Sequence, residues 1–277
     1  MGRRRENVPE PRADVNGPRP PSFGARAARV LHAAPPPRYP STMPETPTPI
    51  AAAYAVLLLI GMPILAAVDA RRGADLAAAA KHRRLLYVSV GASLVVLGLV
   101  TLGVAAWQDV PAAALGWRVE APTAALLWGL GVAAAGLVLA WLITVAARLA
   151  GLRETAAVQL LMPRNASEKR AFLALSGIAA VCEEYAYRGF GLWAISAWTG
   201  SPWLAVALVS VSFGLGHGYQ RLAGVLRATA LGVVLAAPVI WTGSLFPSIV
   251  GHFWINAAIG LGGWRYLRAN FEADEPG

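Results

Sequence analysis

The chain has 277 residues, of which 56% are hydrophobic and only 14% are charged. A soluble domain carries about 25% charged residues, so this composition excludes an ordinary soluble globular protein. The formal net charge of +9 does not indicate a nucleic-acid-binding protein, because the Arg and Lys residues lie in the N-terminal tail and in short loops between apolar runs. Charge in such loops sets the topology of a membrane protein. We therefore expect a lipid bilayer as the surroundings and no nucleic acid as a partner.

Residues 1–46 are a different kind of sequence from the rest of the chain. They contain the basic run Arg3–Arg5, the proline run Pro35–Pro37 and no sustained apolar period. Such a segment cannot bury enough apolar surface to offset its chain entropy, so we predict a disordered basic tail. An alternative is that translation starts at Met43, in which case residues 1–42 would be an extension of the sequence and not of the protein.

Seven apolar runs follow this tail. They cover about residues 48–68, 86–107, 123–147, 171–193, 202–219, 222–241 and 245–264. A run of about 20 apolar residues crosses a bilayer core of roughly 30 Å as a helix. The runs lack the alternation of barrel strands. The predicted fold class is therefore all-α, a polytopic transmembrane helix bundle with about seven spans.

The loop charges predict an orientation. The basic residues gather in loops 69–85 and 148–170 and at the C-terminal end, whereas segments 194–201 and 242–247 carry no charge. The positive-inside rule places the basic loops in the cytoplasm and the N-terminus outside. A basic tail on the outer side of the membrane would contradict that rule. The rule therefore also favours a translation start at Met43. The Ala-, Gly- and Arg-rich composition is typical of bacteria, so we expect a multi-pass protein of a bacterial plasma membrane.

The last four spans contain polar residues that a bilayer does not tolerate without a reason. These are Glu183, Glu184, Arg188, His217, His252 and Asn256. An ionisable group inside a bilayer is costly and usually faces the bundle interior, where it has a function. The first three spans contain almost no ionisable residue and are predicted to be a scaffold.

The spacing of the first three polar residues is informative. Glu184 and Arg188 are four apart, so they share one helix face and can neutralise each other. Glu183 points about 100° away and has no built-in counter-ion. One interpretation is that Glu184 and Arg188 form only an internal ion pair that fixes packing. The unpaired Glu183 is harder to assign to packing alone.

The same four-residue spacing recurs on two later runs, between Phe213 and His217 and between His252 and Asn256. Three helices thus each present a polar face, and together these faces could enclose one site. His217 could instead mark the end of its span, and His252 with Asn256 could be a hydrogen-bonded pair between helices.

One carboxylate, two imidazoles and one carboxamide can support hydrolysis. Glu183 could take a proton from water as a general base and pass it to a leaving amine. His217, His252 and Asn256 could orient the water or donate hydrogen bonds to a developing oxyanion. Alternatively, Glu183, His217 and His252 could hold a zinc ion that activates the water. The helical HExxH zinc motif is absent, so such ligands would have to come from separate helices.

These residues form three ordered motifs: EExxxR at 183–188, FxxxH at 213–217 and HxxxN at 252–256. In this order, on successive apolar segments, they resemble the CPBP family of intramembrane proteases. That family includes the CAAX prenyl endopeptidase type and the bacterial Abi or bacteriocin-immunity type. The resemblance covers about residues 165–265.

The resemblance implies an endopeptidase that cleaves a membrane-associated protein or peptide. By this resemblance Glu183 is the catalytic base, Glu184 and Arg188 support it, and His217, His252 and Asn256 complete the site. Both a metalloprotease and a glutamate-dependent mechanism stay open. Prenylated CAAX substrates are eukaryotic, so that substrate is not transferred. The expected domains are residues 47–165 as scaffold, 166–268 as the catalytic domain and 269–277 as a tail.

Two other functions remain as alternatives. The chain could be a non-catalytic immunity factor or scaffold that keeps the same fold, or a transporter or proton relay, because buried Glu and His residues also serve those roles. Straight helices would spread the polar residues over about 10 Å of membrane depth. A shared site therefore predicts a tilted or broken span around residues 213–222, where Gly214, Gly216 and Gly218 occur.

Overall fold

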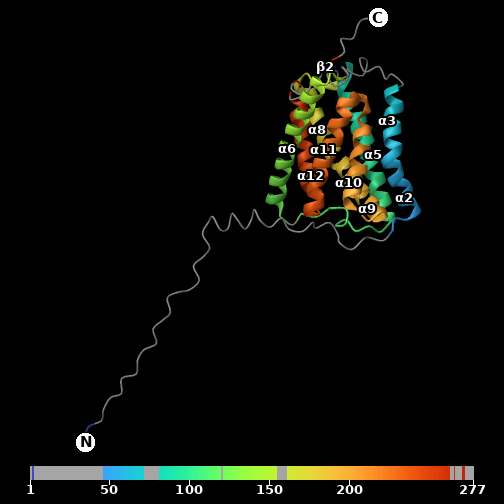
Figure 1. The fold of residues 1–277 in the computed structure, drawn as a ribbon, viewed down its shortest axis with the longest axis vertical. Coiled ribbons are helices and arrows are strands. Elements are labelled where there is room, and N and C mark those ends of the chain that lie inside the picture. Colours follow the sequence, from blue (N-terminus) through green and yellow to red (C-terminus); the bar gives the residue numbers. More distant parts are fainter. Residues whose placement is uncertain are drawn as a thin grey trace. The chain divides into compact units, whose positions relative to one another are not determined.

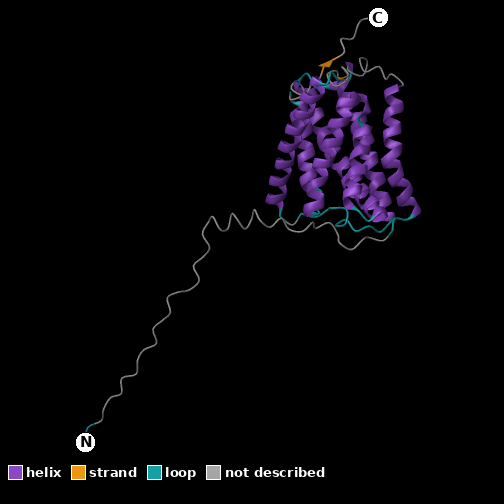
Figure 2. Cartoon of the chain, viewed as in Figure 1, coloured by secondary structure: helices purple, strands orange, loops and turns teal. Residues whose placement is uncertain are grey.

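The computed structural model describes Gly2 and residues 46–71, 81–119, 121–154, 161–262, 265 and 270–271. The predicted tail 1–46 lies almost wholly outside these residues. The compact unit that begins at Pro37 is helical throughout its spans (Figures 1 and 2). Its first elements are α2 (Pro49–Val56), η1 (Leu57–Gly61), α3 (Met62–Arg71), α5 (Arg83–Trp107), α6 (Pro122–Leu149) and the two-residue strand β1 (Arg153–Glu154).

The second half of this unit contains the remaining elements. They are α8 (Ala166–Glu183), η2 (Glu184–Gly191), α9 (Leu192–Thr199), α10 (Pro202–Gly216), η3 (Gly218–Gln220), α11 (Arg221–Thr242), α12 (Phe246–Gly260) and β2 (Asn270–Phe271). Strand β2 pairs with β1 in parallel. Each of the seven predicted apolar runs coincides with one helix or with consecutive helices, so the all-helical bundle expected from the sequence is confirmed.

Among the described residues, four helical segments are long and apolar enough to cross a membrane by length and composition. They are Pro49–Val68, Arg83–Trp107, Pro122–Leu149 and Gly218–Thr242. Their exposed faces carry large apolar side chains such as Leu99, Leu127 and Leu142, which are half or more exposed. A bilayer removes such faces from water, so this exposure fits a protein surrounded by lipid.

Local sequence signals explain where several helices begin and end. Proline occupies the first turn of α2, α6, α10 and α12, where its missing N–H has no helical partner to lose. The side chains of Thr48, Asn165 and Ser201 accept hydrogen bonds from the first turns of α2, α8 and α10. The helices α9 and α11 end at Gly200 and Gly243, both at φ +68°, a conformation that glycine adopts without strain.

Glycines also let the helices of the second half approach closely. A Cβ at Gly251 of α12 would lie 2.7 Å from Val132 Cγ1 and 3.2 Å from the Gly129 carbonyl oxygen of α6. A Cβ at Gly232 of α11 would lie 2.9 Å from Ser210 Cβ of α10. Small residues at such contacts are the usual basis of helix packing in membranes. They hold α6, α10, α11 and α12 close together around the polar residues.

The break predicted around residues 213–222 is present. The helix α10 ends at Gly216, His217 leaves the helical conformation, and α11 begins at Arg221 after the single turn η3. Arg221 has φ +60° and ψ −170°. This backbone region is almost restricted to glycine and costs on the order of 1–3 kcal/mol for other residues, so the surrounding packing must hold the turn in place.

Candidate active site

Glu183 and Glu184 lie at the junction between an α-helix and a π-helical segment. Glu183 is the last residue of α8, and Glu184 is the first residue of η2, a π-helical segment in which all eight residues are buried. Such wide turns are rare and occur often at functional sites. The change of winding was not predicted, because no residue type in the segment 184–191 marks it.

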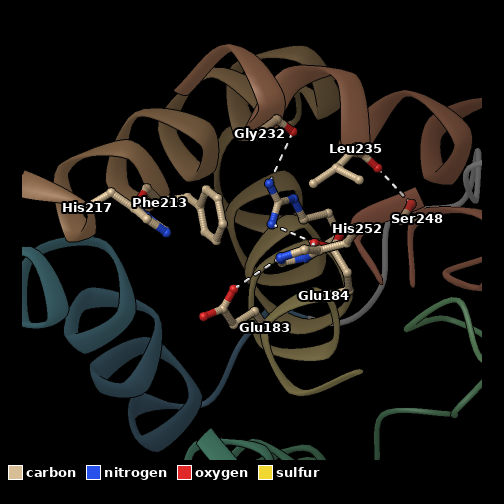
Figure 3. Close-up of polar contacts among 9 residues, drawn as sticks. Glu183, Glu184, Phe213, His217, Gly232, Leu235, Ser248 and His252 are labelled. Atoms are coloured by element: carbon tan, nitrogen blue, oxygen red, sulfur yellow. Dashed lines mark hydrogen bonds and ion pairs between the residues drawn. The ribbon is translucent and has the colours of Figure 1, made fainter. Parts of the chain in front are cut away.

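Glu184 is bound from two sides. Its side chain is fully buried, and Arg188 Nη1 donates to its Oε1 at 3.0 Å. His252 Nδ1 lies 2.8 Å from the same oxygen, and a carboxylate oxygen accepts, so the Nδ1–H donates. The ion pair expected from the four-residue spacing therefore forms, and it extends to a histidine 68 positions away in the sequence (Figure 3).

Arg188 is held by two further contacts. Its Nη2 donates to the Gly232 carbonyl oxygen at 3.3 Å, and its guanidinium carbon lies 4.4 Å from the centre of the Phe213 ring. The aromatic face attracts a cation, and the attraction is strongest where water is excluded. Sequence reasoning missed Gly232, because a backbone acceptor has no side-chain signal. Phe213 was singled out only for its spacing from His217, whereas its ring faces the buried cation.

His252 connects the two carboxylates. Its Nε2 lies 3.6 Å from Glu183 Oε2, which is ion-pair distance but too long for a hydrogen bond. The Glu183 side chain is 18% exposed, whereas that of Glu184 has no exposed surface. Glu184 thus fixes the imidazole, and the second ring nitrogen faces the carboxylate that remains partly accessible (Figure 3).

A hydrogen bond one turn before His252 on α12 also fixes the position of this histidine. One turn earlier on α12, the Ser248 hydroxyl donates to the Leu235 carbonyl oxygen of α11 at 2.7 Å, and both groups are buried (Figure 3). The carbonyls of Leu235 and Gly232 lie on neighbouring turns of α11. The same helix therefore anchors both α12 and the Arg188 side chain.

His217 lies beside this network and not in it. Its Nδ1 donates to the Phe213 carbonyl oxygen at 2.8 Å, and its ring centre lies 4.7 Å from that of Phe213. The centre of the Phe213 ring lies 4.4 Å from the Arg188 guanidinium carbon, and the ring meets the His252 ring edge to face at 6.2 Å. The rings of His217, Phe213 and His252 thus form one wall next to Glu183.

The turn η3 extends that wall with residues that the sequence did not single out. The Tyr219 ring centre lies 6.2 Å from that of His217. Its hydroxyl oxygen accepts a hydrogen bond from Gln220 Nε2 at 2.9 Å. Only the strained backbone of Arg221, which sequence cannot show, distinguishes this turn from an ordinary connection between spans.

Asn256 lies one turn beyond His252 on α12 and is half-buried. Among the described residues, the hydrogen bonds and ion pairs that join Glu183, Glu184, Arg188 and His252 do not extend to it. The structure therefore brings four of the six predicted residues into one contact network and places His217 and Asn256 at its margins.

The zinc alternative needs three ligands around one point. Within the described ranges, no three His, Cys, Asp or Glu residues are placed to hold a metal ion. Glu183 and His252 are close, but His217 is not placed with them around one point. The arrangement therefore does not fit a metal ion held by Glu183, His217 and His252.

Comparison with known proteins found one family model that this region matches. Residues 167–258 match the family model described as Type II CAAX prenyl endopeptidase Rce1-like. The match lies within the predicted domain 166–268, contains all three motifs, and is consistent with the CPBP resemblance. No curated protein and no solved structure matches the chain.

Proposed function

We propose that the protein is an intramembrane endopeptidase in which Glu183 activates the attacking water, because residues 167–258 match the Rce1-like family model and contain all three motifs. The observation that carries the proposal is the pairing of Glu183 with His252 Nε2 at 3.6 Å. Glu184 binds the His252 imidazole directly. Arg188 and the carbonyl oxygens of α11 hold Glu184 and α12 in position. The Glu183 side chain remains partly accessible.

The proposed reaction uses Glu183 twice. A water beside the Glu183 carboxylate gives it a proton and attacks the carbonyl carbon of the scissile peptide bond. The carbonyl oxygen becomes an oxyanion. When the tetrahedral intermediate collapses, the C–N bond breaks and Glu183 returns the proton to the leaving amine, so the carboxylate is regenerated.

The other residues support that step. The Nδ1–H bond to Glu184 orients His252, whose Nε2 side faces the same space as Glu183 and can position the water. We assign His217 and Asn256 to substrate contacts, in which the Asn256 carboxamide can donate a hydrogen bond to the oxyanion and His217 Nε2 can accept one from the peptide. Their positions at the margins of the network fit groups that meet a bound peptide and not Glu183 directly.

We propose that the substrate is a membrane-associated protein or peptide, because the site lies between helices that fit a bilayer. The basic loops face the cytoplasm in this proposal, and the protein is an integral, multi-pass protein of the plasma membrane. Residues 47–165 serve as the scaffold for the catalytic segment 166–268.

A cleavage assay tests the proposal. Purified protein in liposomes is incubated with a library of membrane-proximal peptides, and wild type is compared with Glu183→Ala. We expect cleavage by the wild type and its loss in the variant. Cys182→Ala is the matched control, because Cys182 is adjacent to Glu183 but lies outside the contact network. It should cleave normally.

A chelator added to the wild type separates the two chemistries that the motifs leave open. Cleavage that survives chelation supports water activation by Glu183 without a metal. Cleavage that is unchanged in Glu183→Ala would contradict the proposed site. A loss of cleavage in Cys182→Ala would mean that the Cys182 thiol is needed for activity. Failure of the wild type to cleave any peptide would favour the non-catalytic alternative.

A further inference from the structure

A basic pocket lies outside the candidate active site, between the start of α8 and the end of α12. Its volume is about 440 Å³. It is lined by Met162, Pro163, Arg164, Lys169, Gly260, Leu261, Gly262 and Arg265.

Three positive charges reach this pocket from different parts of the chain. Arg164 precedes α8, Lys169 lies in its second turn, and Arg265 follows α12. None of the described residues that line the pocket is acidic. The neighbouring Glu168 accepts a hydrogen bond from the Arg164 backbone N–H at 2.7 Å and does not line it. Like charges that converge on one cavity attract an anion.

The walls of the pocket are built by helix packing. A Cβ at Gly260 would overlap the Phe172 ring, so α12 and α8 are in close contact beside the pocket. The Phe172 ring meets Tyr87 at 5.5 Å, and the Tyr87 hydroxyl donates to the Leu161 carbonyl oxygen at 2.6 Å. These contacts place the pocket's segments before any ligand arrives.

We propose that this pocket binds the phosphate headgroup of an anionic phospholipid. The ends of membrane-crossing helices lie at headgroup depth, and basic pockets between such helices suit anionic headgroups. Met162 and Leu261 add apolar surface to the rim, and Leu261 is 49% exposed, so an acyl chain can continue from the headgroup along the helices. A free phosphate ion would satisfy the charges but not this surface.

The bound lipid would join two helices that the active site also joins. The helix α8 ends at Glu183, and α12 carries His252. A ligand that binds only the packed arrangement stabilises it by mass action. The proposed lipid site does not depend on the proposed peptidase activity, and lipid binding alone tests it.

The experiment titrates purified protein in a neutral detergent with phosphatidylglycerol and counts bound lipids by native mass spectrometry. We expect one retained phosphatidylglycerol and no equivalent retention of phosphatidylcholine. Each basic residue near an anionic lipid contributes about fivefold in affinity, so the triple variant Arg164→Gln, Lys169→Gln, Arg265→Gln should bind on the order of 100-fold more weakly.

Arg170→Gln is the matched control. Arg170 is exposed and adjacent to Lys169, but it does not line the pocket, so the variant should retain the lipid. Lys169→Arg, which keeps the charge, should retain it as well. Circular dichroism and gel filtration check folding of the triple variant, and the single variant Lys169→Gln, with a loss of about fivefold, carries the test if the triple variant misfolds.

Three results would overturn the proposal. One is equal weakening by Arg170→Gln and Lys169→Gln, which would mean diffuse surface charge. Another is equal retention of phosphatidylcholine. The last is displacement of the lipid by inorganic phosphate at an equal concentration, which would assign the pocket to a free anion.

Discussion

In the first spans, a buried polar contact joins two neutral hydroxyls, with Tyr54 Oη 2.6 Å from Thr101 Oγ1 between α2 and α5. In the segment 167–258, which matches the family model, the buried contact joins Glu184, Arg188 and His252 on η2 and α12. A hydrogen-bonded hydroxyl pair loses little when it leaves water, whereas buried ions lose much of their solvation, and here Glu184 Oε2 and Arg188 Nε have no hydrogen-bond partner among the described residues. The first arrangement suits a scaffold, and the second is kept only where precise placement of charge matters.

The largest effect on activity is expected for Glu183→Gln. The carboxamide keeps the size of the side chain but cannot take a proton from water, so the cleavage rate should fall by up to about 10⁴-fold. Because Glu183 is partly exposed and makes no short hydrogen bond to His252, the free energy of unfolding should change by less than about 0.5 kcal/mol. Rate measurements and denaturant unfolding in micelles check both. A large loss of stability would mean that Glu183 has a packing role.

The largest effect on stability is expected for Glu184→Ala. It leaves the buried guanidinium of Arg188 without its carboxylate, which should cost about 3–5 kcal/mol of unfolding free energy. In the scaffold, Tyr54→Phe removes only a neutral hydrogen bond and should cost about 1 kcal/mol. Unfolding of both variants under the same conditions measures the contrast. Similar losses would mean that the buried ion pair is solvated and that the two regions do not differ.

His217→Ala distinguishes a substrate contact from a structural one. If His217 contacts the reacting peptide only in the transition state, its loss should lower kcat by about 10²-fold, with KM nearly unchanged. A structural role would lower stability and leave kcat of the folded fraction intact. Asn256→Ala provides the comparison, because Asn256 also lies at the margin of the network. A variant that raises KM alone would show uniform binding of substrate and transition state.

Much of this fold could be predicted from sequence, because bilayer thickness converts apolar runs into helices with few alternatives. The Glu184–Arg188 pair was equally accessible, since four-residue spacing places two side chains on one helix face. The boundaries of the helices were less predictable from the sequence. The fourth run was expected at 171–193, whereas its helical segment covers 166–199, because charged residues in the first turns of α8 interrupt the apolar pattern but not the helix.

The internal geometry of the site could not be predicted, because it depends on how helices far apart in sequence pack. Nothing local shows that His252 meets both carboxylates. These contacts follow from the depth and rotation of α12 against α8. The motifs predicted which residues matter but not which of them touch.

A smaller effect than that of Glu184→Ala is expected from the glycines that set those depths. Gly232→Ala would place a Cβ 2.9 Å from Ser210 Cβ and 3.1 Å from its Cα, so α11 must move away from α10. That overpacking should cost about 1–3 kcal/mol and shift the carbonyl that Arg188 binds, with a parallel loss of cleavage. On the scaffold helix α5, a Cβ at Gly103 has nothing within 4 Å, so Gly103→Ala should change stability by less than about 1 kcal/mol and leave cleavage intact. Equal effects of the two substitutions would mean that helix spacing in the segment 167–258 is as tolerant as that of the scaffold, and that the buried charges alone hold the site together.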